Sequence, residues 1–340
     1  MSRTISRKKS ISGLGLNLVT HTNDPVRIKK YVDSVKKLNA WIRMEFDFYR
    51  YEKNPSAQIE LLDSLVGNFA AADIPILGLL CGNTPGDFSS LFYPQLKYRS
   101  VVNRLNSFRK FVRFCVKRYG NIVSHWEIWN EPNLKRFWVK KLDFREYSEM
   151  LKKVSEDIRS IQSQSVIVCS GMSGNDMDNL LWSPNSLLNY KKYFSGIIEN
   201  DYGKYFDVAN FHPYYIQCYA SVRRRQYFEK RSVAIIRELR SRVAELVPDK
   251  PMWLTEFGIS TTLNLFLSQK DIAKIYIEVI KECVKMNVPL ALWCLYDENN
   301  KGYGVTNPEK GFSLLDEDLV PNAIYDELLK FGSEALGERN

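Results

Sequence analysis

Apolar and polar positions along the chain repeat as an ordered series of strand-like and helix-like segments. Short apolar runs rich in β-branched and aromatic residues predict strands at residues 11–19, 41–49, 74–81, 125–130, 165–171, 206–214, 251–257 and 288–296. Amphipathic stretches with a helical period follow them, at residues 25–39, 56–72, 98–119, 143–163, 186–200, 225–246, 269–287 and 322–333. A capping side chain followed by a first-turn proline marks two of these helix starts, at Asp24-Pro25 and Asn54-Pro55.

Eight such strand–helix units predict an α/β fold, a single (β/α)8 TIM barrel. Residues 1–10 form a basic N-terminal extension, and we expect residues 11–340 to be one barrel, because no linker or low-complexity tract interrupts the pattern. No apolar run approaches the roughly 20 residues of a membrane-spanning helix. The apolar run after the basic start is short, contains Asn17 and lacks a small-residue cleavage site, so we expect a cytoplasmic protein that does not contact a membrane.

The composition excludes several other classes of protein. The chain has six scattered cysteines and three histidines, so we expect reduced core cysteines and no bound metal. The net charge of +9 could favour an acidic partner. The most basic patch, Arg223 to Arg225 with Lys230 and Arg231, could bind an anionic polymer, but no nucleic-acid motif accompanies it, and we interpret it as the solvated start of a helix.

Two glutamates stand at the carboxyl ends of predicted strands. Residues 125–132, His-Trp-Glu-Ile-Trp-Asn-Glu-Pro, run from an apolar strand into Glu131 and stop at Pro132. Residues 252–258, Met-Trp-Leu-Thr-Glu-Phe-Gly, place Glu256 in the same way. The active site of such a barrel lies at these strand ends, so we expect the two carboxylates to face each other, as cleavage of a glycosidic bond requires. A single glutamate at a strand end could instead cap a loop or pair with a surface lysine.

The surroundings of the two glutamates predict different roles. A retaining glycosidase needs an acid that protonates the departing oxygen and a carboxylate, about 5–5.5 Å away, that attacks the anomeric carbon. The apolar neighbours of Glu131 favour a protonated carboxyl, which fits the acid/base. Glu256 fits the nucleophile if a cation or hydrogen-bond donor keeps it ionised, and Arg43 and Tyr214 are the candidates. Asn130 could hold a sugar hydroxyl beside the reacting centre.

These residues resemble the motifs of the clan A glycoside hydrolases, and most closely those of family 39 and related family 5 enzymes. The resemblance covers residues 11 to 335 and rests on Trp129-Asn-Glu-Pro132, Phe211-His-Pro-Tyr214, Thr255-Glu-Phe-Gly258 and the closing segment 311–325, together with Arg43 and Trp293. It implies that Glu131 is the acid/base and Glu256 the nucleophile. It also implies that Arg43, His212 and Tyr214 lie beside them and that Trp293 forms an aromatic platform under the bound sugar.

Two features depart from the family's pattern. The clan often has a histidine after the third strand, where this chain has Asn83, so Asn83 substitutes for it or the first sugar site is altered. Family 39 xylosidases resemble a barrel with an appended β-sandwich, for which this chain has no segment, so we expect endo-acting cleavage. Trp138 and Trp182 follow the fourth and fifth strands and could either stack on a sugar or pack within their loops.

The sequence thus predicts a retaining β-glycoside hydrolase that cleaves an oligo- or polysaccharide by double displacement and uses no cofactor. Transglycosylation is open if the cleft favours a sugar acceptor over water. The alternatives are an exo-acting, β-xylosidase-like enzyme and a non-catalytic carbohydrate-binding barrel. A basic barrel that binds nucleic acid is a further rival, which steeply salt-dependent binding to DNA or RNA would support.

Overall fold

The computed structural model describes residues 10–82, 101–134, 137–138, 143–174, 190–214, 225–262, 267–298 and 311–337. The strands are β1 (Leu14–Val19), β2 (Trp41–Asp47), β3 (Ile76–Cys81), β4 (His125–Ile128), β5 (Val166–Val168), β6 (Met172–Gly174), β7 (Ala209–Pro213), β8 (Met252–Phe257) and β9 (Leu290–Asp297). The helices are α1 (Pro25–Lys37), α2 (Phe48–Lys53), α3 (Pro55–Ala71), α4 (Leu105–Tyr119), α5 (Phe144–Ile161), α6 (Tyr190–Glu199), α7 (Arg225–Leu246), α8 (Gln269–Lys285) and α9 (Ala323–Gly337). Short 3-10 turns, η1 (Val101–Arg104) and η2 (Tyr202–Tyr205), precede α4 and β7.

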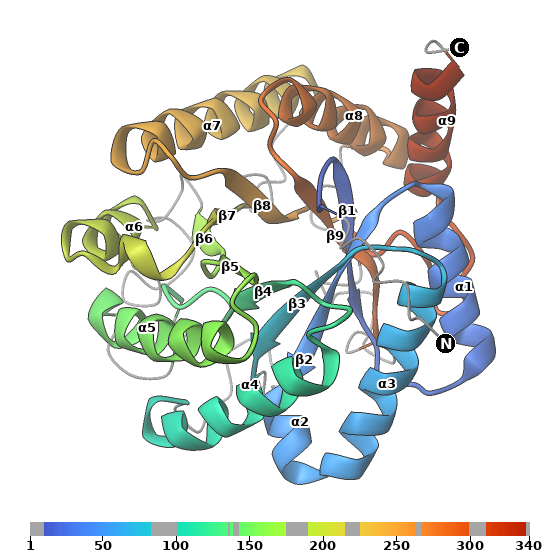
Figure 1. Ribbon diagram of the computed structural model, residues 1–340. Coiled ribbons are helices and arrows are strands. Elements are labelled where there is room, and N and C mark those ends of the chain that lie inside the picture. Colours follow the sequence, from blue (N-terminus) through green and yellow to red (C-terminus); the bar gives the residue numbers. More distant parts are fainter. Residues whose placement is uncertain are drawn as a thin grey trace.

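The strands form one curled parallel sheet with the helices around it, in the order β5-β4-β3-β2-β1-β9-β8-β7-β6 (Figure 1). β5 lies within the fifth predicted strand, residues 165–171, and β6 begins one residue beyond the end of that range. β5 pairs with β4, whereas β6 pairs with β7. A parallel bridge joins Val168, in β5, to Val208, the residue before β7, so the sheet closes on itself. The predicted (β/α)8 barrel is therefore confirmed, with its fifth strand broken in two.

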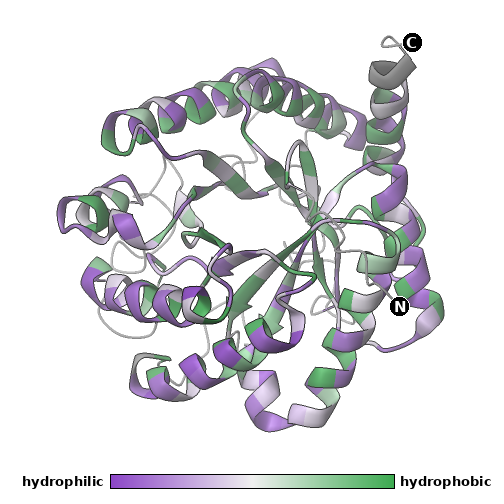
Figure 2. Ribbon diagram, viewed as in Figure 1, coloured by the Kyte–Doolittle hydropathy of each residue, from purple (hydrophilic) through white to green (hydrophobic). Residues whose placement is uncertain are grey.

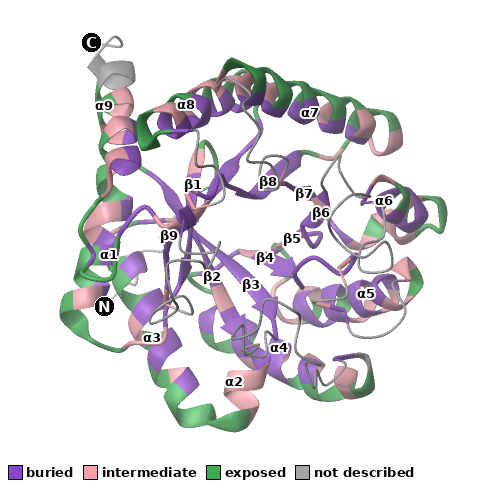
Figure 3. Ribbon diagram, turned by 180° about the vertical axis from the view of Figure 1, so that it is seen from behind, coloured by how far each residue is buried: buried purple, intermediate pink, exposed green. Residues whose placement is uncertain are grey.

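The helices cover the outside of the barrel with their apolar faces inward. Figure 2 shows this alternation of apolar and polar faces, and Figure 3 shows buried strands inside helices whose outer faces are exposed. The predicted caps are confirmed, because the side chains of Asp24 and Asn54 accept hydrogen bonds from Val26 N and Ala57 N at the starts of α1 and α3. No helix in the described parts of the chain is long and apolar enough to cross a membrane.

The floor of the barrel is apolar. One cluster fills the N-terminal ends of the strands, and its buried members are Ile11, Trp41, Leu77, Val168, Val208, Trp253 and Ala291. The rings of Trp41 and Trp253 lie 6.2 Å apart in this cluster. A Cβ atom at Gly15 would come within 2.3 Å of the Trp41 ring, so glycine allows the indole to fill the floor. The polar interior of the barrel is therefore confined to its opposite, carboxyl-terminal end.

One α-helix and one strand were not predicted. The helix α2 begins directly after β2, because the side chain of Asp47 accepts hydrogen bonds from Tyr49 N and Arg50 N. The strand β6 follows the break after β5. Five of the cysteines are free and buried, as expected, namely Cys81, Cys115, Cys169, Cys283 and Cys294, while Cys218 lies outside the described residues.

Candidate active site

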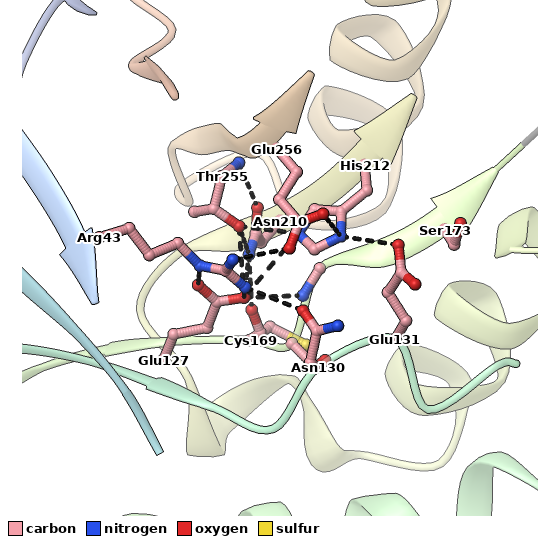
Figure 4. Close-up of polar contacts among 12 residues, drawn as sticks. Arg43, Glu127, Asn130, Glu131, Cys169, Ser173, Asn210, His212, Thr255 and Glu256 are labelled. Carbon is pink, nitrogen blue, oxygen red and sulfur yellow. Dashed lines mark hydrogen bonds and ion pairs between the residues drawn. The ribbon is translucent and has the colours of Figure 1, made fainter. Parts of the chain in front are cut away.

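The centre of the polar end is the guanidinium of Arg43, which points from β2 toward the axis of the barrel (Figure 4). It pairs with the carboxylate of Glu127 on β4 through two bonds, from Nε to Oε2 at 2.7 Å and from Nη2 to Oε1 at 2.9 Å. Arg43 is 2% exposed and Glu127 is 0% exposed. Burial alone lowers the pKa of Arg43, but the charges of Glu127 and Glu256 more than offset it and raise that pKa above its usual range. Arg43 is therefore a permanent cation inside the barrel.

The same guanidinium reaches three more side chains. Nη1 donates to Oε1 of Glu256 at 2.7 Å and to Oδ1 of Asn17 at 2.8 Å, and Nη2 donates to Oδ1 of Asn130 at 2.9 Å. Asn17 in turn donates to the carbonyl oxygens of Thr255 and Leu292. Arg43 thus links β1, β2, β4 and β8, and its positive charge lies next to the carboxylate of Glu256.

Glu256 is surrounded by donors. The hydroxyl of Tyr214 donates to its Oε2 at 2.8 Å, and Nδ1 of His212 lies 3.5 Å from the same oxygen. Burial by itself raises the pKa of this carboxyl, but the charges of His212 and Arg43 and the hydrogen bonds from Tyr214 and Arg43 outweigh burial and lower the pKa below its usual range. Glu256 is therefore ionised near neutral pH, as a nucleophile must be.

Glu131 faces Glu256 across the imidazole of His212. Nδ1 of His212 is 3.0 Å from Oε1 of Glu131, and an oxygen of each glutamate and a ring nitrogen of His212 all lie within 4.8 Å of one another. In retaining glycosidases the two carboxyl groups are about 5–5.5 Å apart, whereas inverting enzymes need a wider gap for water. The nearest oxygens of Glu131 and Glu256 are therefore closer together than the wide gap of an inverting enzyme requires.

Hydrogen bonds behind His212 determine which of its ring nitrogens carries a proton. The Thr255 hydroxyl accepts from Asn210 Nδ2 and donates to Glu127 Oε1, so Nε2 of His212, at 2.9 Å, can only donate to it. With Nε2 as a donor to Thr255, Nδ1 is the ring atom that forms the hydrogen bond with Glu131. The imidazole of His212 is thereby held in orientation between Thr255 and Glu131.

Glu127 was not among the predicted site residues. Its carboxylate accepts five hydrogen bonds, two from Arg43 and one each from Gly171 N, Asn210 Nδ2 and the Thr255 hydroxyl. The signal that could have identified it is the two-residue alternation, which places Glu127 inside the barrel, where a buried charge requires a partner.

The segment after β4 departs from strand alternation. The pattern places Trp129 on the face of Glu127 and Glu131, but β4 ends at Ile128 and Trp129 has a left-handed φ of 71°. The Trp129 ring therefore packs outward against Phe108 and Trp138, and Asn130 turns inward to Arg43. The ladder ends here, so the two-residue period no longer applies.

The remaining predicted residues have different surroundings. Trp293 lies on β9 and is half-buried. Trp138 is 2% exposed, packs edge-on against Trp129 and Tyr147, and donates a hydrogen bond to Glu146. Its ring is therefore packed within the protein, and this position favours loop packing over stacking on a sugar. Asn83 and Trp182 lie outside the described residues.

Within the basic patch, Arg225 pairs with Glu229 on α7 and with Asp271 on α8, as expected for a solvated helix face. Arg223 and Arg224 lie outside the described residues.

The group of Glu131, His212 and Glu256 also has the spacing of a metal site. Both oxygens of Glu256 already accept hydrogen bonds, one from Arg43 and one from Tyr214. The positive charge that offsets Glu256 is supplied by the protein itself, which favours carboxylate chemistry over a metal centre.

Comparisons with known proteins agree with the barrel fold. Residues 88–326 match the family model described as glycosyl hydrolases family 39. A family 39 glycoside hydrolase from Bacteroides cellulosilyticus WH2 superposes with a TM-score of 0.62 and 17% identity, over 94% of this chain and 63% of that chain. An endo-1,4-β-D-mannanase from Thermotoga petrophila RKU-1 has a TM-score of 0.64 and 13% identity, over 95% and 100%. A β-xylosidase from Caulobacter crescentus CB15 has a TM-score of 0.60 and 16% identity, over 96% and 70%. At these identities the likeness to the solved structures shows the shared barrel fold.

Proposed function

This chain belongs to glycosyl hydrolases family 39 and is a glycosidase, and we propose that it cleaves β-glycosidic bonds of an oligo- or polysaccharide with retention of configuration. Glu131 is the proposed acid/base and Glu256 the proposed nucleophile. The observation that carries this proposal is the asymmetric pair itself, in which Glu256 is held ionised by Arg43 and Tyr214 while Glu131 is hydrogen-bonded to His212. Two neighbouring carboxyl groups in such different surroundings are suited to different roles, as nucleophile and as acid.

In the first step, an oxygen of Glu256 attacks the anomeric carbon as Glu131 gives its proton to the departing glycosidic oxygen. The product is a glycosyl ester on Glu256, in which the carboxylate has lost its charge. Arg43 keeps Glu127 as a counter-ion at this stage, so the buried cation is never left unpaired. In the second step, Glu131 takes a proton from water, and the resulting hydroxide attacks the same carbon and releases Glu256.

Asn130 and Trp293 are proposed to bind the sugar next to the cleaved bond. The Oδ1 atom of Asn130 accepts a hydrogen bond from Arg43, which fixes the orientation of the amide. Nδ2 of the same amide is then the atom that we propose donates to a sugar hydroxyl. The half-buried indole of Trp293 offers an apolar face to a sugar ring.

For the mode of attack, we propose endo-acting cleavage, with exo-acting cleavage as the second candidate. Both modes occur among the structural neighbours, since an endo-mannanase and a β-xylosidase share the fold. The endo-mannanases from Thermotoga petrophila RKU-1 and Rhizomucor miehei align over 100% and 96% of their own lengths, which is the support for the endo mode.

The first experiment is labelling with 2-deoxy-2-fluoro β-glycosides of xylose, mannose and glucose, and of their disaccharides, followed by peptide mass mapping. We expect the label on Glu256, because fluorine slows the breakdown of the glycosyl-enzyme. Glu256→Gln should abolish the label, while the matched change of a remote glutamate at the end of α6, Glu199→Gln, should leave it intact. Label on another residue, or a product of inverted configuration by NMR, would overturn the proposal.

The mode of attack is tested with β-1,4-linked xylohexaose and mannohexaose. Endo-acting cleavage gives intermediate oligosaccharides at the earliest times, whereas exo-acting cleavage gives a single small product and a hexamer shortened from one end. Release of monosaccharide alone from the start would reject the endo mode and leave the catalytic assignment unchanged.

A further inference from the structure

The segment that carries Glu131 leaves the sheet before it reaches this residue. The ladder between β4 and β5 ends at the pair Glu127 and Val168. Beyond it, Trp129 and Glu131 adopt left-handed φ angles of 71° and 43°. Non-glycine residues rarely adopt this conformation, and it persists only where surrounding contacts hold it. The proposed acid therefore depends on contacts made by its own loop.

A side chain continues the sheet where the backbone has left it. Asn133 Nδ2 donates to the Ser173 carbonyl oxygen at 2.7 Å, and Ser173 N donates to Asn133 Oδ1 at 3.0 Å. These two bonds occupy both backbone groups of Ser173 on the side of β6 that faces the Glu131 loop, as a neighbouring strand would. The backbone N–H of Glu131 adds a third bond to the Gly171 carbonyl oxygen at 3.2 Å. The amide of Asn133 thus stands in for a ladder residue.

The other edge of β6 pairs with β7, the strand that carries His212. Ser173 is level with His212 in the parallel pairing of β6 with β7, and Figure 4 labels both residues together with Glu131. His212 is the residue whose Nδ1 lies 3.0 Å from Glu131. Asn133 is 0% exposed, so bulk water does not compete for its two bonds in the wild-type chain. Ser173 therefore connects the Glu131 loop on one side with His212 on the other.

We propose that Asn133 is a positioning residue for the acid/base, which fixes Glu131 at hydrogen-bonding distance from His212 through the two bonds to Ser173. This inference rests on the proposed role of Glu131. The consequence is specific. Loss of the Asn133 amide should weaken proton donation to the leaving group and leave the attack by Glu256 intact, because Arg43 and Tyr214 hold Glu256 from other strands.

The test measures how the rate depends on the leaving group. Asn133→Ala and Asn133→Ser are compared with the wild-type chain on 2,4-dinitrophenyl, 4-nitrophenyl and phenyl β-glycosides of the sugar that labels the protein fastest. Dinitrophenol departs without protonation, whereas phenol requires it. We expect kcat/KM for the phenyl glycoside to fall about 10–100-fold, which is part of the 10²–10⁴-fold effect of general acid catalysis, and kcat/KM for the dinitrophenyl glycoside to fall less than about 3-fold. The serine variant leaves a hydroxyl and room for water, so it serves if the alanine variant does not fold.

The matched control is Gln162→Ala. Gln162 accepts from Trp126 Nε1 and donates to the carbonyl oxygen of Gly120, so it ties down β4 at the end remote from the site. Its loss should lower the melting temperature without any dependence on the leaving group. A uniform fall across the three substrates in the Asn133 variants, or no fall, would overturn the inference. Glu131→Ala is measured in parallel, and if it too lacks leaving-group dependence, it is the role of Glu131 that has failed.

Discussion

We expect that replacing Glu127 with glutamine lowers the melting temperature of the protein but still allows a fluoro-sugar to label Glu256. Glu127 is fully buried and accepts five hydrogen bonds, and both of its oxygens face Arg43. The amide of glutamine carries no charge and turns an N–H toward one of these donors. Removing one partner of a buried ion pair costs about 3–5 kcal/mol. Over 340 residues, with an unfolding entropy of about 2.1 cal/mol/K per residue, this lowers the melting temperature by about 4–7 °C.

Glu256→Gln is the comparison, because it removes the other carboxylate of Arg43. Glu256 accepts hydrogen bonds from Arg43 and Tyr214, and Arg43 retains both of its bonds to Glu127. We therefore expect a smaller change in melting temperature together with the loss of fluoro-sugar labelling. Glu127→Gln should still be labelled, but more slowly, because Arg43 then interacts with Glu256 alone and makes it a weaker nucleophile.

Two measurements decide this prediction, namely thermal unfolding at pH 7 followed by circular dichroism and the rate of labelling by a dinitrophenyl 2-fluoro-glycoside. A melting temperature of Glu127→Gln within about 1 °C of the wild type would refute the assigned cost of the buried pair. A larger loss of stability in Glu256→Gln than in Glu127→Gln would refute the division of roles between the two carboxylates.

Three further predictions concern single residues. Tyr214→Phe removes a donor to the ionised form of Glu256, so the pKa of that carboxyl rises and the acidic limb of the kcat/KM profile moves to higher pH. Gly171→Ala places a Cβ atom 1.9 Å from Nε2 of His212, so the ring must move, and we expect a loss of about 1–3 kcal/mol in a urea titration and a lower kcat. Burial raises the pKa of Asp47 to about 7 from an unfolded value of 3.8, so its proton stabilises the fold below pH 4 and this contribution is lost as the pH rises through 7. Asp47→Asn keeps the cap of α2 and should flatten the pH dependence of stability between pH 4 and 7; an unchanged slope would contradict the burial argument.

Much of the fold could be predicted because each element is encoded locally. The apolar period located the strands and the main helices, and the caps at Asp24 and Asn54 marked helix starts to the residue. The helix α2 escaped prediction because it is short and follows β2 without a turn, with Asp47 serving both the end of the strand and the cap of the helix. The break between β5 and β6 escaped because the predicted strand, residues 165–171, included Ser170 and Gly171, which in the structure lie between the two short strands.

By itself the sequence determined the fold class and the two strand ends that carry Glu131 and Glu256, since period and motif are read from neighbouring residues. Only the tertiary structure decided how these residues are supported. Arg43 meets carboxylates 84 and 213 positions away, and such partners depend on how the strands are staggered around the barrel. The left-handed turn at Trp129 ends the alternation that would otherwise assign its face. The two bonds between Asn133 and Ser173 join residues 40 positions apart, beyond the point where the pairing of β4 with β5 ends.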